Sequence, residues 1–520
     1  MTRMYPLRSE RRRLLAKLPA LHRERGIARD GLKQSRWHRR MGAYACGMVL
    51  VLSLGFAVPA LGQSPLIDAA QTPPQEASAE SILRTQTTGL CPDLIASYNN
   101  GEIQTGSARE DLLVRCREVV AESRRPDGTL DSVRNGLQSM APEEVSAQGT
   151  NIMETSNMQF SNITARLAAL RGGATNVSLR PYALQLEQPD LPFTLVASTA
   201  PVALSAAREP EETAAPFSKF GLFANGTYSF GDKDATLRES GFDFHTFWVT
   251  AGGDYRLNRN VILGVALGYQ ATDVDLDLDG GASDVNGYSI SVYGTYLVTD
   301  RFYIDSIVSV GWQDYDIERS IRYSVPGLNP DGSPTGSTTV VDQTARGDSD
   351  AVWYAFSVGA GYDFNVGSFT LGPFARLNYL KADIDGYREE TDNTAAGYGL
   401  LLDVGSQDVV SLATVLGGEA TYALSTPWGV LLPQLRLEWE HEFENDSRTI
   451  YASFVEDPTP NSEWQMQLQT DDPDRDFFRL GLGLSGTFRG GVSGFVQYET
   501  VFGLADVAAH NIALGVRVEL

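Results

Sequence analysis

The chain has 520 residues, of which 42% are hydrophobic and 21% charged, with a formal net charge of −23 and a pI near 4.7. It is too long for one ordinary domain, and its acidic balance argues against nucleic-acid binding, because phosphates would be repelled. The charge is uneven: residues 1–40 hold 13 basic and three acidic residues, whereas the remainder carries −33.

A basic arm followed by an apolar segment opens the sequence. The uncharged stretch Met41–Gly62 ends with small residues at the −3 and −1 positions of a cut after Gly62. This pattern predicts a secretory signal peptide over residues 1–62 with an extended basic region, which addresses the chain to the Sec translocon. The alternative, a transmembrane anchor, is disfavoured by Pro59. The sequence has no later run of 18 uncharged apolar residues, so we expect no helical membrane span in the mature chain.

Residues 63–141 are predicted to form a short helical region. Ser107 and Glu110 have the spacing of a capping box at the start of a helix. Only Cys91 and Cys116 remain after signal-peptide removal. An even pair of cysteines in an exported chain predicts one disulfide.

Residues 142–172 are predicted to form one long polar helix, which starts at a proline and stops at a Gly-Gly pair. About 30 residues at about 1.5 Å each give a length of roughly 45 Å. Its surface is rich in small, uncharged polar side chains, as suits either a narrow hydrated tube or an ordinary surface helix. Residues 173–216 contain six prolines, which predict a linker.

From Phe217 onward, apolar and polar side chains alternate along long segments. Alternation also fits a β-sandwich, but the strands are long and their connections alternate between tight turns and long loops, as in an outer-membrane barrel. We expect twelve antiparallel strands near 217–230, 241–256, 259–276, 284–298, 301–318, 348–365, 368–385, 408–424, 428–445, 475–488, 490–503 and 508–520. The inward face would carry the charged residues Arg376, Arg436, Glu438, Glu440, Arg479, Glu499, Arg517 and Glu519. The predicted fold class is an all-β transmembrane barrel with a small N-terminal α-helical region.

Residues 217–520 resemble the β-domain of autotransporters, the type V secretion proteins. The stretches that carry the resemblance are Gly252–Leu257, Val261–Tyr269, Tyr288–Tyr296, Gly361–Phe364, Leu371–Tyr379, Leu432–Phe443 and Leu480–Ser485. The resemblance implies a signal peptide, a passenger that reaches the cell surface through the barrel, and a helix that fills the lumen. It therefore implies a passenger role for residues 63–141 and a lumen position for the helix 142–172.

The resemblance also implies assembly by the barrel-assembly machinery, which reads the last strand. Here that strand has apolar residues at every second position, namely Ile512, Leu514, Val516, Val518 and Leu520. Family members end with an aromatic residue, whereas this sequence ends with Leu520. The expected surroundings are outer-membrane lipid and lipopolysaccharide of a Gram-negative bacterium.

Candidate chemistry in the sequence is sparse. His441 shares the outward face with Trp439 and Phe443, as in an interfacial girdle. Gly347–Asp350 is similar to the Gly-Asp-Ser motif of surface esterases, but it precedes a barrel strand.

Three aspartates, Asp275, Asp277 and Asp279, match the start of a calcium loop, but its twelfth position is Asn286 and not Glu. We therefore expect no enzyme, cofactor or resident metal, with these aspartates as a weak calcium candidate.

The leading prediction is an outer-membrane autotransporter whose barrel exports or anchors a short helical passenger. The alternative is a non-secreting channel or adhesin-like barrel with a periplasmic N-terminal domain. A third class, an outer-membrane hydrolase, would depend on His245 and not on His441.

Overall fold

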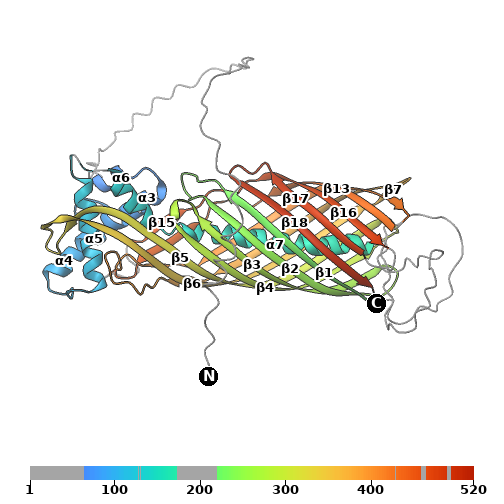
Figure 1. Ribbon diagram of the computed structural model, residues 1–520, viewed down its shortest axis with the longest axis horizontal. Coiled ribbons are helices and arrows are strands. Elements are labelled where there is room, and N and C mark those ends of the chain that lie inside the picture. The colour runs from blue at the N-terminus through green and yellow to red at the C-terminus, as the bar shows by residue number, and fades with distance from the viewer. Residues whose placement is uncertain are drawn as a thin grey trace, which may run out of the picture. The chain divides into compact units, whose positions relative to one another are not determined.

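The computed structural model describes residues 64–171 apart from 127 and 129, and residues 220–519 apart from 428, 445, 458–463 and 489–492. The predicted signal peptide, the predicted linker 173–216 and Leu520 lie outside the described residues. So do the side chains of Arg517, Val518 and Glu519. The described residues form a barrel with a helix inside it and five further helices at one end (Figure 1).

Twelve antiparallel strands close into the barrel wall, as predicted. Each strand pairs with its neighbour in the chain, β8 pairs with β11, and β1 pairs with β18, so the wall has no free lateral edge. The wall strands are β1 (Phe220–Lys233), β2 (Phe242–Arg256), β3 (Val261–Leu276), β4 (Gly281–Leu297), β5 (Phe302–Leu328), β6 (Pro334–Tyr362), β8 (Phe369–Ile384), β11 (Gln407–Tyr422), β13 (Gly429–Glu442), β16 (Asp476–Phe488), β17 (Ser493–Phe502) and β18 (Val507–Glu519). The short strands β7 (Phe364–Val366) and β12 (Leu424–Thr426) extend two of the tight turns.

The outer face is apolar between two belts of aromatic side chains. The ring centres of Tyr269 and Tyr288 lie 5.3 Å apart in the upper belt, which follows the long-loop side. Phe369 and Tyr422 lie 4.6 Å apart in the lower belt, beside the tight turns. On β3, the lower level is at Val261, which pairs with the exposed Tyr296, and the upper level is at Tyr269. These positions are eight residues apart, which at about 3.4 Å per residue and a tilt of about 40° span roughly 21 Å. This height suits the apolar band of a membrane barrel.

The predicted loop over 319–347 is wrong, because β5 and β6 continue through it as one hairpin. Their pairing runs from Phe302↔Tyr362 to Leu328↔Pro334, well above the upper aromatic belt. Alternation continues in this stretch, since Ile321, Tyr323 and Val325 are buried while Arg322 between them is exposed. The inner face of the hairpin is covered by helices.

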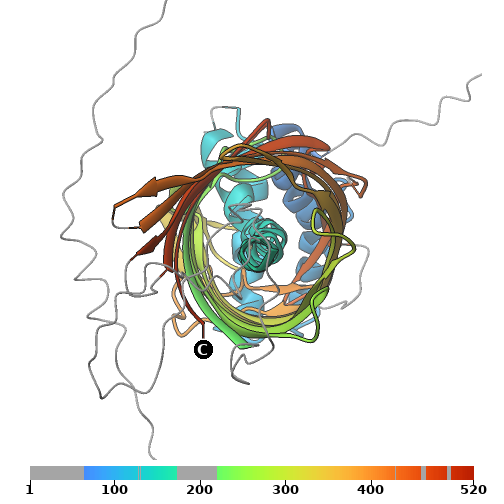
Figure 2. The ribbon, with the colours of Figure 1, turned by 90° about the vertical axis from the view of Figure 1, so that its right-hand side faces the viewer.

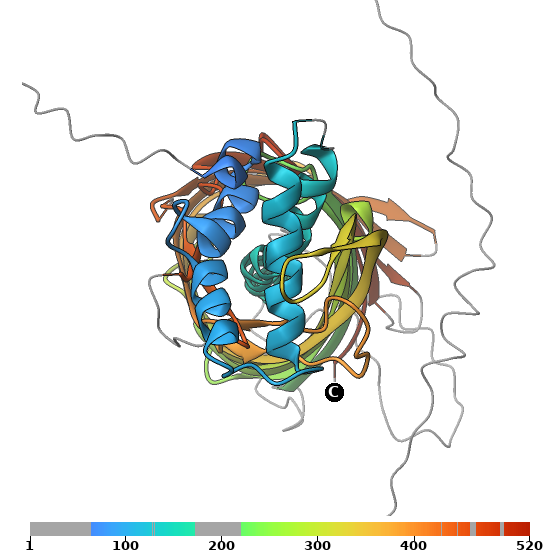
Figure 3. The same cartoon turned by 90° about the vertical axis from the view of Figure 1, so that its left-hand side faces the viewer.

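Five helices lie across the long-loop mouth of the barrel (Figure 3). They are α2 (Pro65–Ala69), α3 (Pro73–Leu83), α4 (Leu90–Asn99), α5 (Ala108–Ser123) and α6 (Leu130–Met140). Ser107 caps α5 by accepting a hydrogen bond from the Glu110 amide at 3.2 Å, as predicted. A disulfide joins Cys91 on α4 to Cys116 on α5. Both half-cystines are buried in the core of these helices.

A second, small sheet lies beside these helices and is built from two further long loops. It contains β9 (Tyr387–Arg388), β10 (Leu402–Val404), β14 (Thr449–Phe454) and β15 (Met466–Gln469) in the order β15-β14-β10-β9. We refer to the five helices, this sheet and the β5–β6 extension together as the cap.

Candidate functional site

A single helix, α7 (Glu144–Arg171), runs along the inside of the barrel (Figure 2). Five polar residues repeat on one of its faces at spacings of three and four, namely Asn151, Thr155, Gln159, Asn162 and Arg166. Residues at this spacing share one side of a helix. Each of them bonds to inward side chains of β1 to β5, so α7 is held against one half of the wall.

Neutral hydrogen bonds form the upper and middle part of this contact. Thr155 donates to the Gln270 amide oxygen at 2.7 Å and accepts from the Gln313 amide nitrogen at 2.9 Å. One turn further on, the Gln159 amide nitrogen donates to the Ser291 hydroxyl at 2.8 Å. Burial of these groups is tolerated because each finds a partner. The small polar residues of α7 are therefore matched to the wall one by one.

A buried ion pair follows towards the tight-turn end. The Arg166 guanidinium donates two hydrogen bonds to the Asp254 carboxylate, at 2.7 and 3.1 Å. The two side chains are 0% and 1% exposed. Tyr293 donates a further hydrogen bond to Asp254 at 3.3 Å. A Cβ atom on Gly221 would lie 2.3 Å from the Arg166 guanidinium, so only glycine leaves room for it.

The C-terminal end of α7 lies near the start of β5. Arg171 pairs with Asp305 there, and its guanidinium stacks 3.7 Å from the centre of the Tyr303 ring. Both partners follow a tight turn of the barrel. The first strand, β1, also starts at this end, because Phe220 pairs with Tyr255 beside the next tight turn.

Six of the eight residues that we expected to face the lumen have described side chains, and they form two ion-pair groups on the other half of the wall. Arg376 and Arg436 both contact one oxygen of Glu438, at 2.5 Å each. Arg479 lies 3.1 Å from Glu440 and 3.6 Å from Glu499. The remaining two, Arg517 and Glu519, belong to β18, but their side chains lie outside the described part.

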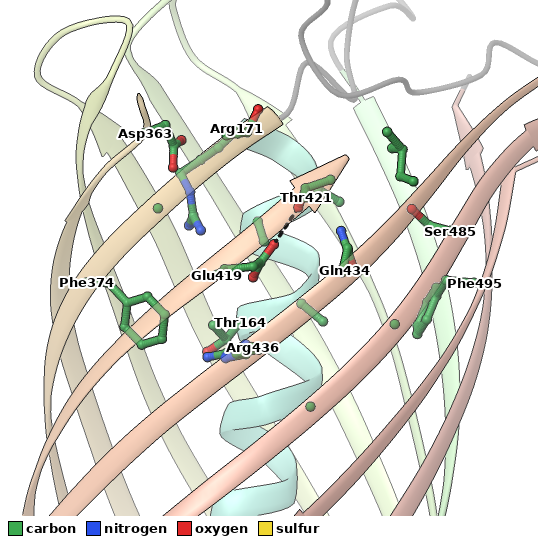
Figure 4. A pocket seen from close by; sticks show the side chains of 18 of the residues that line it. Thr164, Arg171, Asp363, Phe374, Glu419, Thr421, Gln434, Arg436, Ser485 and Phe495 are labelled. Atoms are coloured by element: carbon green, nitrogen blue, oxygen red, sulfur yellow. Dashed lines mark hydrogen bonds between the residues drawn. The ribbon is translucent and has the colours of Figure 1, made fainter. Parts of the chain in front are cut away.

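A cavity of about 170 Å³ separates α7 from this charged half of the wall. Figure 4 shows Arg171, Asp363, Glu419, Gln434 and Arg436 around it. Its lining includes residues of α7, β5, β6, β7, β8, β11, β13, β16 and β17 and carries both signs of charge. The lumen thus has a side bonded to α7 along the helix and a side that retains open space, where Arg376 donates to the Thr164 hydroxyl of α7 at 3.3 Å.

The other candidate residues are dispersed. Asp275 ends β3, whereas Asp277 and Asp279 flank the exposed Leu278 in a turn. The part of the chain that the structure describes contains no group of three or more His, Cys, Asp or Glu side chains able to hold a metal ion.

His441 lies on the outer face, between Trp439 at 5.8 Å and Phe443 at 4.8 Å, measured between ring centres, and contacts Asp476 at 2.8 Å. His245 is also on the outer face and contacts the Tyr228 hydroxyl at 3.1 Å.

The esterase-like motif Gly347–Asp350 lies in β6, and the expected assembly residues lie in the last strand, β18. Ser349 lies within β6, where its hydroxyl donates to the Asp385 carbonyl at 2.7 Å. It is thus part of the barrel wall. On β18, the expected assembly residues Ile512, Leu514 and Val516 are exposed on the outer face.

Residues 222–499 match the family model of the autotransporter beta-domain. The chain belongs to the autotransporter family. This confirms the fold class, the family resemblance and the location in the outer membrane of a Gram-negative bacterium. The autotransporter barrel domain is not itself catalytic, and membership implies association with the outer membrane and assembly by its barrel-assembly machinery.

Relatives match this autotransporter over part of their length only. Esterase EstA of Pseudomonas aeruginosa is 25% identical over 49% of this chain and 36% of its own length. Outer membrane protein B of Rickettsia japonica is 27% identical over 38% of this chain and 11% of its own length. The chain therefore spans about a third or less of the length of these relatives.

Among solved structures, the translocator domain of autotransporter NalP from Neisseria meningitidis is 15% identical, with a TM-score of 0.43 over 60% of this chain and 90% of that one. None of the helices in the described part of this autotransporter is both long and apolar enough to cross a membrane.

Proposed function

We propose that this autotransporter exports its own N-terminal helical segment through the barrel and keeps it at the cell surface. The observation that carries the proposal is the direction of α7. Its first residue, Glu144, directly follows the helices at the long-loop mouth, and its last residue, Arg171, lies at the tight-turn end where β1 begins. Tight turns of such barrels face the periplasm and long loops face outward. The cap is then on the outside.

The exported segment is small and helical, and α7 anchors it. The neutral hydrogen bonds to β1–β5 and the Arg166–Asp254 pair hold the helix at one height in the lumen. The cap across the long-loop mouth weighs against the alternative of an open channel (Figure 3). No catalytic step is proposed, since Ser349 is bonded into the wall and His245 and His441 face outward.

Three further partners belong to the proposed function. We propose that the upper aromatic belt lies at the headgroups of lipopolysaccharide, that the terminal strand engages the barrel-assembly machinery, and that the signal peptide engages the Sec translocon. Aromatic side chains favour this interfacial level because one part of the ring system is apolar and another polar.

An epitope inserted between Asn100 and Glu102, which are exposed after α4, tests the direction of export. Labelling in intact cells is expected, without permeabilisation. A matched epitope in the tight turn at Asn258–Arg259, also exposed, should be labelled only after permeabilisation. Labelling of both epitopes only after permeabilisation would replace the proposal by a barrel with a periplasmic N-terminal domain.

A further inference from the structure

The helical segment 64–126 shares its core with the long-loop elements of the barrel. One continuous cluster of buried side chains contains Leu112 and Leu113 of α5 together with Tyr323 of β5, Leu400 and Phe454. These five belong to four separate parts of the chain. A segment of about 60 residues buries little apolar area alone and commonly needs additional support.

The loop before β10 fits closely on α5. The Asp111 carboxylate accepts hydrogen bonds from the backbone amides of Gly397 at 2.9 Å and Gly399 at 3.0 Å. A Cβ atom on Gly399 would lie 2.2 Å from the Ala108 carbonyl oxygen and 2.6 Å from the Leu112 nitrogen. The two backbones therefore touch where only glycine permits it.

The β5–β6 extension makes a second charged contact with the same helix. The Glu118 carboxylate accepts from the Leu328 amide at 3.0 Å and from the Thr339 hydroxyl at 2.8 Å. Arg115 lies between the two acidic residues and pairs with both. Asp111 and Glu118 are 8% and 0% exposed, so the four hydrogen bonds from the barrel satisfy charges that are removed from water.

The loop between β14 and β15 supplies a third contact. The Trp464 indole donates to Asp93 of α4 at 2.8 Å, and Arg109 of α5 donates to the Glu456 carbonyl at 3.2 Å. Three different long-loop elements therefore hold α4 and α5 from different sides.

We propose that the long-loop elements of the barrel act as a receptor for segment 64–126, so that the segment stays bound after its covalent link to α6 is cut. The exported segment is then a subunit-like part of the cap, retained by non-covalent contacts as well as by α7. Proteolysis between α5 and α6 at the cell surface does not release it. The surface setting rests on the proposed function, whereas the binding itself does not.

The test uses the purified full-length protein in detergent with a protease site inserted after Pro126, which is exposed and follows α5. The disulfide lies entirely within the released piece, because Cys91 and Cys116 both precede the cut. After cleavage, the fragment is expected to co-elute with the barrel in gel filtration and to separate only in denaturant. A fragment that elutes alone while the barrel keeps its heat-modifiable gel mobility would overturn the proposal.

Substitutions test whether the loop before β10 retains the cleaved fragment. Gly399→Val drives a side chain into the α5 backbone and should raise the released fraction by about tenfold, since about 1.4 kcal/mol lost corresponds to tenfold. The matched control is Gly418→Val, where nothing lies within 4 Å of the added Cβ atom. Should Gly399→Val fail to fold, Asp111→Ala removes the acceptor of the Gly397 and Gly399 amides and should raise the released fraction in the same direction. Equal retention in all variants would contradict a loop-specific receptor.

The same cut made on intact cells separates the two proposals. Cleavage in intact cells with the fragment still on the cells supports both. Cleavage followed by release into the medium refutes the receptor and leaves export standing. Absence of cleavage until the cells are permeabilised refutes export, while co-elution in detergent still supports the receptor.

Discussion

The Arg166–Asp254 pair should determine how firmly α7 stays in the lumen. The two side chains are 0% and 1% exposed and share two hydrogen bonds. Removing one partner of such a pair leaves a buried charge without compensation, which typically destabilises by about 3–5 kcal/mol. Arg166→Met or Asp254→Leu alone should therefore increase undocking of α7 by roughly 150- to 4500-fold. The apolar pair Arg166→Met with Asp254→Leu should restore most of the docking, because neither charge then remains buried.

Thiol labelling measures this undocking. Ser289 is 3% exposed, and a Cβ atom on the neighbouring Gly268 would lie 2.4 Å from its hydroxyl and 3.1 Å from the Gln159 amide oxygen of α7. A Ser289→Cys reporter should react with a maleimide only when α7 leaves. The two single variants and the double variant form a cycle whose coupling energy isolates the pair. Single variants that label at the parental rate, or a double variant equal to the sum of the singles, would refute the reasoning.

Three further outcomes are expected. Replacing Cys91 and Cys116 by alanine should lower the free energy of unfolding of the cap by about 3 kcal/mol, measured by the urea midpoint of protease resistance. Burial raises the pKa of the Asp111 carboxyl above its ordinary value of 3.8. The stability that its protonated form contributes to the cap is complete below that value and is lost as pH rises through the higher folded pKa. Cap stability should therefore fall with rising pH, and Asp111→Asn should flatten that fall in urea titrations. Leu267→Arg, on the outer face between the aromatic belts, should destabilise the barrel by about 2–4 kcal/mol and reduce heat-modifiable protein on gels. Leu278→Arg, at a still more exposed side chain in the turn beyond the upper belt, should not.

The barrel could be predicted closely because its rules are local. Lipid on one side and water on the other force alternation at every second residue, and tight turns mark where each strand reverses. For β3, expected over 259–276 and observed over Val261–Leu276, both signals are present. The same reasoning identified Glu438 and Arg479 as inward residues, because charges among alternating apolar residues must face the wet side.

The cap could not be predicted because its core is assembled from distant pieces. Met466 and Leu112 are both buried in one cluster, although more than 300 residues separate them. The alternation of Ile317, Ile321 and Tyr323 was visible in the sequence, yet it lies beyond the height that a membrane requires. Strand prediction from membrane height does not apply above the membrane. There the inward side chains of β5 are buried against α5 and α6.

The two halves of the lumen differ in what they need from α7. On β8 and β13, Glu438 pairs with Arg376 and Arg436 of the same wall, and Arg376 also donates to the Thr164 hydroxyl of α7 at 3.3 Å. On β2, the buried Asp254 pairs with Arg166 of α7. The second half therefore stabilises one register of α7, in which Arg166 reaches Asp254. Because the neutral bonds of Thr155 and Gln159 fit that register as well, the helix stops where all of them form together.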